Sequence, residues 1–140
     1  MANGNKTNKE MDKLYISWQE VEDAVTSIAH QIKTKGIKIG YIKGIQRGGL
    51  IPAVLLSHKL NIPMVSNGVL DNSLLIVDDI CDSGQTLADI KKYKCYTATI
   101  HHKQTAITQP DFYYSLASQD KWIVYPWEQV DSETIQDYLK

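Results

Sequence analysis

Two acidic residues and a group of small hydroxyl residues follow a short apolar run in the middle of the chain. The apolar run is Leu-Leu-Ile-Val at residues 74–77, the acids are Asp78 and Asp79, and the hydroxyl group lies within residues 82–86. Four consecutive apolar residues are typical of a strand buried on both faces in a parallel sheet. We therefore expect both carboxylates at the end of a buried strand.

The residues that follow have the composition of an anion-binding turn. They are Asp82, Ser83, Gly84, Gln85 and Thr86. Gly84 can adopt a positive φ, and residues 87–93 are compatible with a helix. Backbone N–H groups at the start of a helix bind anions, and the hydroxyls of Ser83 and Thr86 would add donors. We expect a phosphate to bind in this turn.

A phosphate site beside two fixed carboxylates suits a ligand with a phosphate at one end and vicinal hydroxyls or bound Mg²⁺ further in. Carboxylates accept hydrogen bonds from hydroxyls and coordinate hard cations, and a ribose 5-phosphate has this layout. The alternative is an ordinary strand with an acidic turn and a helix cap rich in Ser and Thr. That alternative would explain some of these residues but not all of them together.

A second candidate anion site follows the expected strand at residues 37–45. Gln46, Arg47 and two glycines separate this strand from a helix expected over residues 50–60. The glycines let backbone N–H groups approach a phosphate, and Arg47 supplies a forked cation. Arg-Gly-Gly also occurs in ordinary turns, so this signal is weak by itself.

Residues 74–86 resemble the phosphoribosyl-pyrophosphate (PRPP) signature of the type I phosphoribosyltransferases. In that signature an apolar strand precedes two acids, two apolar or small residues and Asp-Ser/Thr-Gly-x-Thr, and every position is filled here. The turn at Arg47 resembles the family's pyrophosphate loop, where the peptide bond before this position is often cis. The resemblance makes the Gln46-Arg47 bond a candidate for that conformation.

Residues 122–128, Trp-Ile-Val-Tyr-Pro-Trp-Glu, resemble the Trp-Ile-x-x-Pro-Trp-Asp segment of the bacterial xanthine-guanine phosphoribosyltransferases. Lys103 precedes Trp122 by nineteen residues, which agrees with the spacing in that family. The similarity covers most of residues 15–128. Glu128 departs from it, because the family has Asp at that position.

A larger departure concerns the connection between the short strand expected at residues 64–66 and the central strand. The similar enzymes carry a long mobile loop there that closes over PRPP, whereas this chain has only residues 66–73. Val69 and Leu70 at its tip would contact either a neighbouring subunit or their own domain. Unless a neighbouring subunit covers the site, we expect ordinary PRPP binding, slow transfer and some PRPP hydrolysis, because lids exclude water and complete catalytic sites.

The resemblance implies PRPP-binding roles for the matching residues. Asp78 and Asp79 would hold the ribose hydroxyls and the Mg²⁺ that accompanies PRPP, directly or through hydroxyls and water. Arg47 and Gly48 would bind pyrophosphate. The 5-phosphate would bind to Asp82, Ser83, Gly84, Gln85 and Thr86.

The resemblance also implies a base site. Lys103 would donate to a 6-oxo group, Trp122 would stack on the base, and the Ile123 backbone would accept from the purine 2-position. Asp82 would lie near purine N7 as a candidate proton acceptor. Trp122 could instead be a core residue, since an aromatic residue in a strand usually packs against neighbours.

These roles predict a purine phosphoribosyltransferase that joins guanine, xanthine or hypoxanthine to PRPP and releases pyrophosphate. The bond to pyrophosphate would break through an oxocarbenium-like state, so charge neutralisation by Mg²⁺ and Arg47 would replace a covalent nucleophile. Cys81 is then a packing residue. One alternative is a non-catalytic PRPP- or nucleotide-binding protein of the same fold; another α/β protein with an acidic pocket would not explain residues 83–86.

The elements that position these residues alternate along the chain. Ser17 and Glu20 form a capping box before a helix that contains Trp18, expected in the core, and that ends at Gly36. A further strand is expected at residues 96–101. Its neighbouring residues His101 and His102 would point to opposite faces and so could not chelate one metal.

The sequence therefore predicts an α/β fold with a parallel twisted sheet flanked by helices and a small C-terminal hood at about residues 103–128. Parallel strands place both anion sites at one edge of the sheet, beyond the carboxyl ends of the strands. Residues 1–13 are polar and predict a disordered tail, which leaves residues 14–140 as one domain.

Composition narrows the possible partners. The formal net charge is −1, which indicates no nucleic-acid or anionic-membrane surface. No apolar run approaches the ~20 residues that span a bilayer, and no signal peptide is apparent. The two cysteines are not spaced like metal ligands, so a reducing compartment, the cytoplasm, is the simplest expected location. We expect a homo-oligomer, either a dimer or a tetramer.

Overall fold

Strands and helices alternate along the chain in the computed structural model, which describes residues 12–67 and 70–128. The elements are β1 (Asp12–Tyr15), α1 (Trp18–Lys35), β2 (Tyr41–Gly44), α2 (Leu50–Leu60), β3 (Leu74–Cys81), α3 (Gln85–Lys91), β4 (Tyr96–Lys103), β5 (Phe112–Ala117) and β6 (Lys121–Val124). None of the described helices is long and apolar enough to cross a bilayer.

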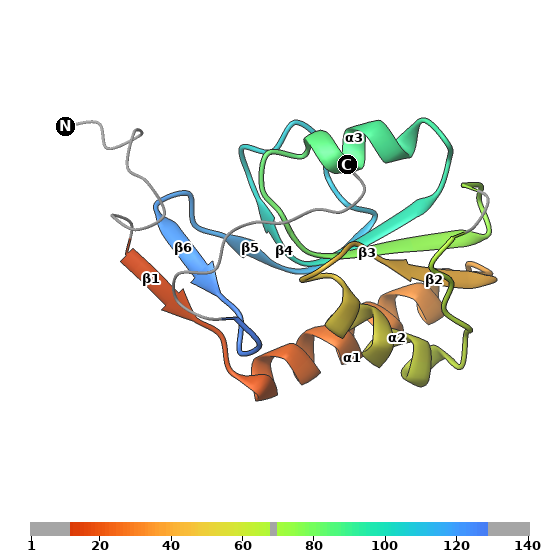
Figure 1. The fold of residues 1–140 in the computed structure, drawn as a ribbon, viewed down its shortest axis with the longest axis horizontal. Coiled ribbons are helices and arrows are strands. Elements are labelled where there is room, and N and C mark those ends of the chain that lie inside the picture. The colour runs from red at the N-terminus through yellow and green to blue at the C-terminus, as the bar shows by residue number, and fades with distance from the viewer. Residues whose placement is uncertain (1–11, 68–69, 129–140) are drawn as a thin grey trace.

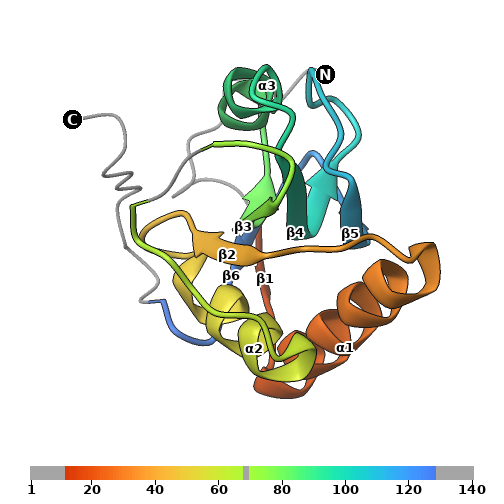
Figure 2. The ribbon, with the colours of Figure 1, turned by 90° about the vertical axis from the view of Figure 1, so that its right-hand side faces the viewer.

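A four-stranded parallel sheet in the order β2-β3-β4-β5 forms the centre of the molecule. Figures 1 and 2 show α1 and α2 on one face of this sheet and α3 on the other. Because helices cover both faces, the central strands are buried on both sides, and residues 74–78 of β3 are all buried. The predicted α/β fold with a parallel sheet flanked by helices is confirmed.

The first helix follows its sequence signals. Ser17 and Glu20 form the capping box, and Gly36 ends the helix with a left-handed φ of 68°. The apolar face of α1 packs into the main core under the sheet. The prediction for Trp18 is wrong: its side chain is 55% exposed, and its ring lies 5.9 Å from the ring of Trp127. Trp18 is the first residue of α1, and its side chain is accessible to solvent at this end of the helix.

Two strand boundaries differ from the prediction for the same physical reason. β2 covers only Tyr41–Gly44, because its partner β3 begins at Leu74, which pairs with Tyr41. β3 continues to Cys81, because β4 extends beside it and pairs His102 with Cys81. Asp78 and Asp79 therefore lie within the second half of the strand and not beyond its end. Met64 forms only an isolated bridge, to Ile42.

The hood differs from the predicted one. β5 belongs to the main sheet, where it pairs with β4, while β6 pairs with β1 in a separate two-stranded parallel sheet. Figure 1 shows this small sheet beside the main sheet. The hood thus combines segments from both ends of the described chain. Asp12 and Lys13, which were expected in a tail, belong to β1, and residues 1–11 lie outside the described part.

The connection at residues 66–73 is partly described. Leu70 packs against a small apolar cluster that includes Ile45, Ile76 and Cys95, so this residue contacts its own domain. Asp71 closes the segment, because its carboxylate accepts hydrogen bonds from the backbone and the hydroxyl of Ser73. Val69 lies outside the described residues.

Candidate active site

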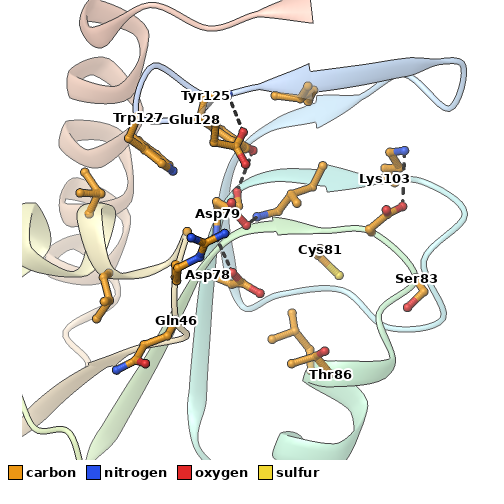
Figure 3. Close-up of a pocket in the computed structure, with 18 of the residues that line it drawn as sticks. Gln46, Asp78, Asp79, Cys81, Ser83, Thr86, Lys103, Tyr125, Trp127 and Glu128 are labelled. Carbon is orange, nitrogen blue, oxygen red and sulfur yellow. Dashed lines mark hydrogen bonds and ion pairs between the residues drawn. The ribbon is translucent and has the colours of Figure 1, made fainter. Parts of the chain in front are cut away.

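The carboxyl ends of β2, β3 and β4 border a cavity of about 570 Å³ that the hood closes from one side. Figure 3 shows Tyr125 and Trp127 of the hood segment on one side, Ser83 and Thr86 on the other, and Asp78 and Asp79 between them. Ligands of open parallel sheets bind at this edge, because the strand-to-helix turns gather there.

Eleven of the twelve predicted site residues line this one cavity. They are Arg47, Gly48, Asp78, Asp79, Asp82, Ser83, Gly84, Thr86, Lys103, Trp122 and Ile123. The exception is Gln85, whose exposed side chain donates to Asp89 on α3. The placement agrees with the predicted site, and the individual roles stay predictions.

The turn before α3 depends on a glycine. Gly84 has a φ of 84°, and a Cβ at this position would lie 2.8 Å from the Thr108 backbone nitrogen. The turn is tied to the segment after β4, because the Ile107 N–H donates to the Ser83 carbonyl at 2.8 Å. The Ser83 hydroxyl accepts from the Gln85 N–H at 3.2 Å. α3 spans Gln85–Lys91, whereas a helix was expected over residues 87–93. Thr86 therefore lies in its first turn, and Ser83 precedes its N-cap, Gly84.

The turn between β2 and α2 lies directly on the acidic pair. The Gln46-Arg47 peptide bond is cis, as the resemblance implied. A Cβ on Gly48 would lie 2.0 Å from Oδ2 of Asp79, and a Cβ on Gly49 would lie 2.3 Å from the Val77 carbonyl oxygen. Both glycines are therefore needed for the turn to approach β3 this closely. The two turns and the acids between them therefore line one cavity.

Burial dominates the electrostatics of the acidic pair. Burial raises the pKa of Asp78 well above its usual value, and the neighbouring charge of Asp79 raises that pKa further. Burial also raises the pKa of Asp79. Local N–H groups offset part of this cost, since Asp78 accepts from the Asp79 amide and Asp79 accepts from the Ile80 amide, each at 2.8 Å. Hydroxyl donors or a cation would stabilise the ionised pair.

Lys103 and Asp82 form an ion pair in the lining of the cavity. The Lys103 ammonium lies 3.4 Å from Oδ1 of Asp82; the lysine side chain is 6% exposed and the aspartate side chain is 56% exposed. A buried cation thus stands beside a carboxylate that solvent reaches. Together they present a hydrogen-bond donor and an acceptor side by side.

Sequence reasoning did not assign the remaining polar groups of the hood. The Tyr125 hydroxyl donates to the Asp79 carbonyl at 3.0 Å and lies 2.8 Å from Nδ1 of His101. The Tyr125 ring stacks on Trp127 with centroids 5.0 Å apart, and Glu128 accepts from the Tyr125 N–H at 2.8 Å. Tyr125, Trp127 and Glu128 lie within the 122–128 motif, which was the one available signal.

The donor set at the cavity suits a metal that arrives with its ligand. Among the described residues, no group of three or more His, Cys, Asp or Glu side chains could hold an ion. Mg²⁺ commonly binds to one or two carboxylates and completes its coordination with substrate phosphates and water. Asp78 and Asp79, adjacent on β3 and lining the cavity, would supply these two carboxylates.

Sequence comparisons find relatives among named enzymes. No protein-family model matches the chain. The xanthine-guanine phosphoribosyltransferase of Cereibacter sphaeroides is 27% identical over a match that covers 81% of this chain and 86% of the relative. The corresponding protein of Chromohalobacter salexigens is 26% identical, with 81% and 82% covered.

Solved structures extend the comparison. A crystal structure of the purine phosphoribosyltransferase from Pyrococcus horikoshii superposes with a TM-score of 0.72 and 33% identity, and the match covers 90% of this chain and 99% of that one. This identity extends over nearly the whole of both chains. The protein therefore belongs to the purine phosphoribosyltransferases, a family of enzymes with the type I phosphoribosyltransferase fold.

Proposed function

We propose that this protein transfers the 5-phosphoribosyl group of PRPP to a 6-oxopurine base and releases pyrophosphate. The observation that carries the proposal is the convergence of two anion-binding turns, an acidic pair and the Lys103–Asp82 pair on one cavity. The relatives named xanthine-guanine phosphoribosyltransferase support the purine as acceptor.

PRPP would span the cavity along the edge of the sheet. Its 5-phosphate would bind the turn at residues 82–86, and its pyrophosphate would bind at Arg47 and Gly48. The ribose between them would lie over Asp78 and Asp79, whose oxygens accept from hydroxyls. Arg47 would offset the negative charge that develops on the leaving pyrophosphate, because a guanidinium binds two phosphate oxygens at once.

Mg²⁺ would be held by Asp78 and Asp79 together with PRPP. The ion would neutralise pyrophosphate charge, because Arg47 alone would neutralise only part of it. Burial raises the pKa of both carboxyls, and a bound cation would favour their ionised forms.

The Lys103–Asp82 pair matches one edge of a 6-oxopurine. Such a base presents an oxygen acceptor at position 6 and, when N7 carries the proton, a donor beside it. Lys103 would donate to the oxygen while Asp82 accepts from N7, and the 3.4 Å separation of the two groups suits neighbouring positions on one ring. Trp122 lines the same cavity and would stack on the base.

A base panel tests the proposal. The protein is incubated with PRPP, Mg²⁺ and, separately, guanine, xanthine, hypoxanthine, adenine, uracil and orotate, and nucleotide and pyrophosphate are quantified. We expect product from the 6-oxopurines alone. Product from adenine or a pyrimidine would contradict the base site, and binding of PRPP with no product from any base would indicate a non-catalytic protein.

Calorimetry tests the PRPP residues separately. Replacing Asp79 by Asn or Thr86 by Ala should weaken PRPP binding about tenfold to a hundredfold, because a hydrogen bond to a charged group contributes about 1.5 to 3 kcal/mol. Asp23→Asn, on the exposed face of α1, is the matched control and should bind PRPP normally. Unchanged affinity in both site variants would refute the assignment.

The quaternary state and location are part of the same proposal. We propose a cytoplasmic dimer or tetramer. Light scattering on the purified protein measures the assembly. A monomer at the concentrations used for assay would contradict this part.

A further inference from the structure

The Asp79 carbonyl lies beyond the point where β2 stops pairing with β3. β2 ends at Gly44, and the last hydrogen bond on that side of β3 runs from the Ile45 N–H to the Val77 carbonyl at 2.8 Å. Alternate carbonyls of a strand point to the same side, so the next one on this side belongs to Asp79. The Tyr125 hydroxyl donates to it at 3.0 Å and replaces the missing strand partner.

The donor and the acceptor can be assigned in both hydrogen bonds of the Tyr125 hydroxyl. The single hydroxyl hydrogen of Tyr125 goes to the Asp79 carbonyl, so Nδ1 of His101, 2.8 Å from the hydroxyl oxygen, must be the donor there. His101 and Tyr125 are both buried, with 7% and 2% exposed. Their rings also pack together with centroids 5.6 Å apart. The chain of donors therefore runs from His101 through Tyr125 to Asp79.

The hood holds the Tyr125 ring in place. Residue 125 directly follows β6, whose residues Trp122 and Ile123 line the cavity. The Tyr125 N–H donates to Glu128, and the ring stacks on Trp127 at an angle of 4°. The hydroxyl is thus a direct link between the segment that lines the base side of the cavity and the strand that carries the acidic pair (Figure 3).

We infer that Tyr125 is a positioning residue for phosphoribosyl transfer, whose hydroxyl, held by His101, fixes the distance between the base-binding strand β6 and the ribose-binding residue Asp79. The inference depends on the proposed function for what binds at each end. Transfer requires the base nitrogen in line with the ribose carbon, and small misplacements of reacting groups are costly. PRPP contacts only the Asp79 side, whereas a product nucleotide spans both sides.

Tyr125→Phe tests the link, because it keeps the ring and its stacking and removes only the hydroxyl. We expect kcat to fall about tenfold and binding of guanosine or inosine monophosphate to weaken about tenfold, while PRPP affinity stays within about twofold. Tyr113→Phe is the matched control: its ring packs on the neighbouring His102 with centroids 5.2 Å apart, outside the cavity. This control should leave all three quantities unchanged.

Two His101 variants separate positioning from mere structural support. His101→Leu removes the donor and should match Tyr125→Phe, with no further loss in the double variant. His101→Asn keeps a donor and should recover most of kcat. Melting temperatures are measured alongside, because a structural role alone would lower them without changing the kcat of the folded protein.

The inference is overturned if Tyr125→Phe keeps wild-type kcat and wild-type nucleotide affinity, or if the losses from Tyr125→Phe and His101→Leu add. Nucleotide and PRPP affinities are equilibrium measurements and need no turnover. Absence of transfer by the wild-type protein would therefore count against the proposed function, whereas an unchanged ratio of nucleotide to PRPP affinity in Tyr125→Phe would count against the Tyr125 link.

Discussion

Replacing Gly48 by Ala should disable the site through a single methyl group. The added Cβ would lie 2.0 Å from Oδ2 and 2.7 Å from Cγ of Asp79. Since real Cβ contacts are not shorter than 3.0 Å, the turn or the carboxylate must shift by at least about 1 Å. A misplacement of this size at a reacting centre costs about a hundredfold in rate. We expect kcat/KM for PRPP to fall by that factor.

Steady-state nucleotide formation with PRPP varied at saturating purine measures this loss, and thermal unfolding checks that the variant is folded. Gly40→Ala is the control, because its Cβ would meet Ser73 at an ordinary 3.5 Å. Gly40→Ala should retain wild-type activity. If Gly48→Ala stays within threefold of the wild-type protein, the close contact between the turn and Asp79 is not required for transfer and our account of this turn is wrong.

Three further predictions concern the base, pH and the short connection. Lys103→Met should remove the preference for hypoxanthine over adenine more than it weakens PRPP binding, measured by paired kinetics and calorimetry; an unchanged preference would contradict the role of Lys103. Burial lowers the pKa of His101 to about 4 from 6.5, so its contribution to folding stability is present above about pH 6.5 and lost as pH falls towards 4. Between pH 6.5 and 4 the free energy of unfolding, measured with denaturant, should therefore fall by about 3 kcal/mol more in the wild-type protein than in His101→Asn. Equal pH dependence in the two proteins would contradict the role of His101 burial. The eight residues 66–73 span at most ~29 Å when extended, and less than half of that outward, because the connection must return to β3. Unless a neighbouring subunit covers the cavity, transfer should therefore be slow and accompanied by PRPP hydrolysis; fast, concentration-independent transfer without hydrolysis from a monomer would contradict this.

Local sequence was sufficient for features whose causes lie within a few residues. The capping box at Ser17 and the left-handed end at Gly36 follow from hydrogen bonds and backbone freedom inside one helix. The turn at residues 82–86 follows likewise, because a positive φ at Gly84 and the hydroxyls beside it are properties of adjacent residues. The cis bond before Arg47 came from the resemblance to the family and not from these local rules.

Features that depend on distant partners required the tertiary structure. The length of β3 depends on how far β4 runs beside it, and the hood depends on β1 pairing with a strand more than a hundred residues later. Exposure of Trp18 likewise depends on what packs against the start of α1. No local pattern encodes these pairings, because strand propensity depends on the neighbours against which a strand packs and does not identify them.

The same division runs through the site. The residue types and spacing at positions 78–86 determined that a phosphorylated ribose was the expected ligand, because phosphate and hydroxyl recognition require those groups in one short segment. The hydrogen bond from Tyr125 to Asp79 joins residues 46 positions apart. It exists only because β2 ends before Asp79 and leaves that carbonyl without a strand partner, which the folded sheet decides and the order of residues does not reveal.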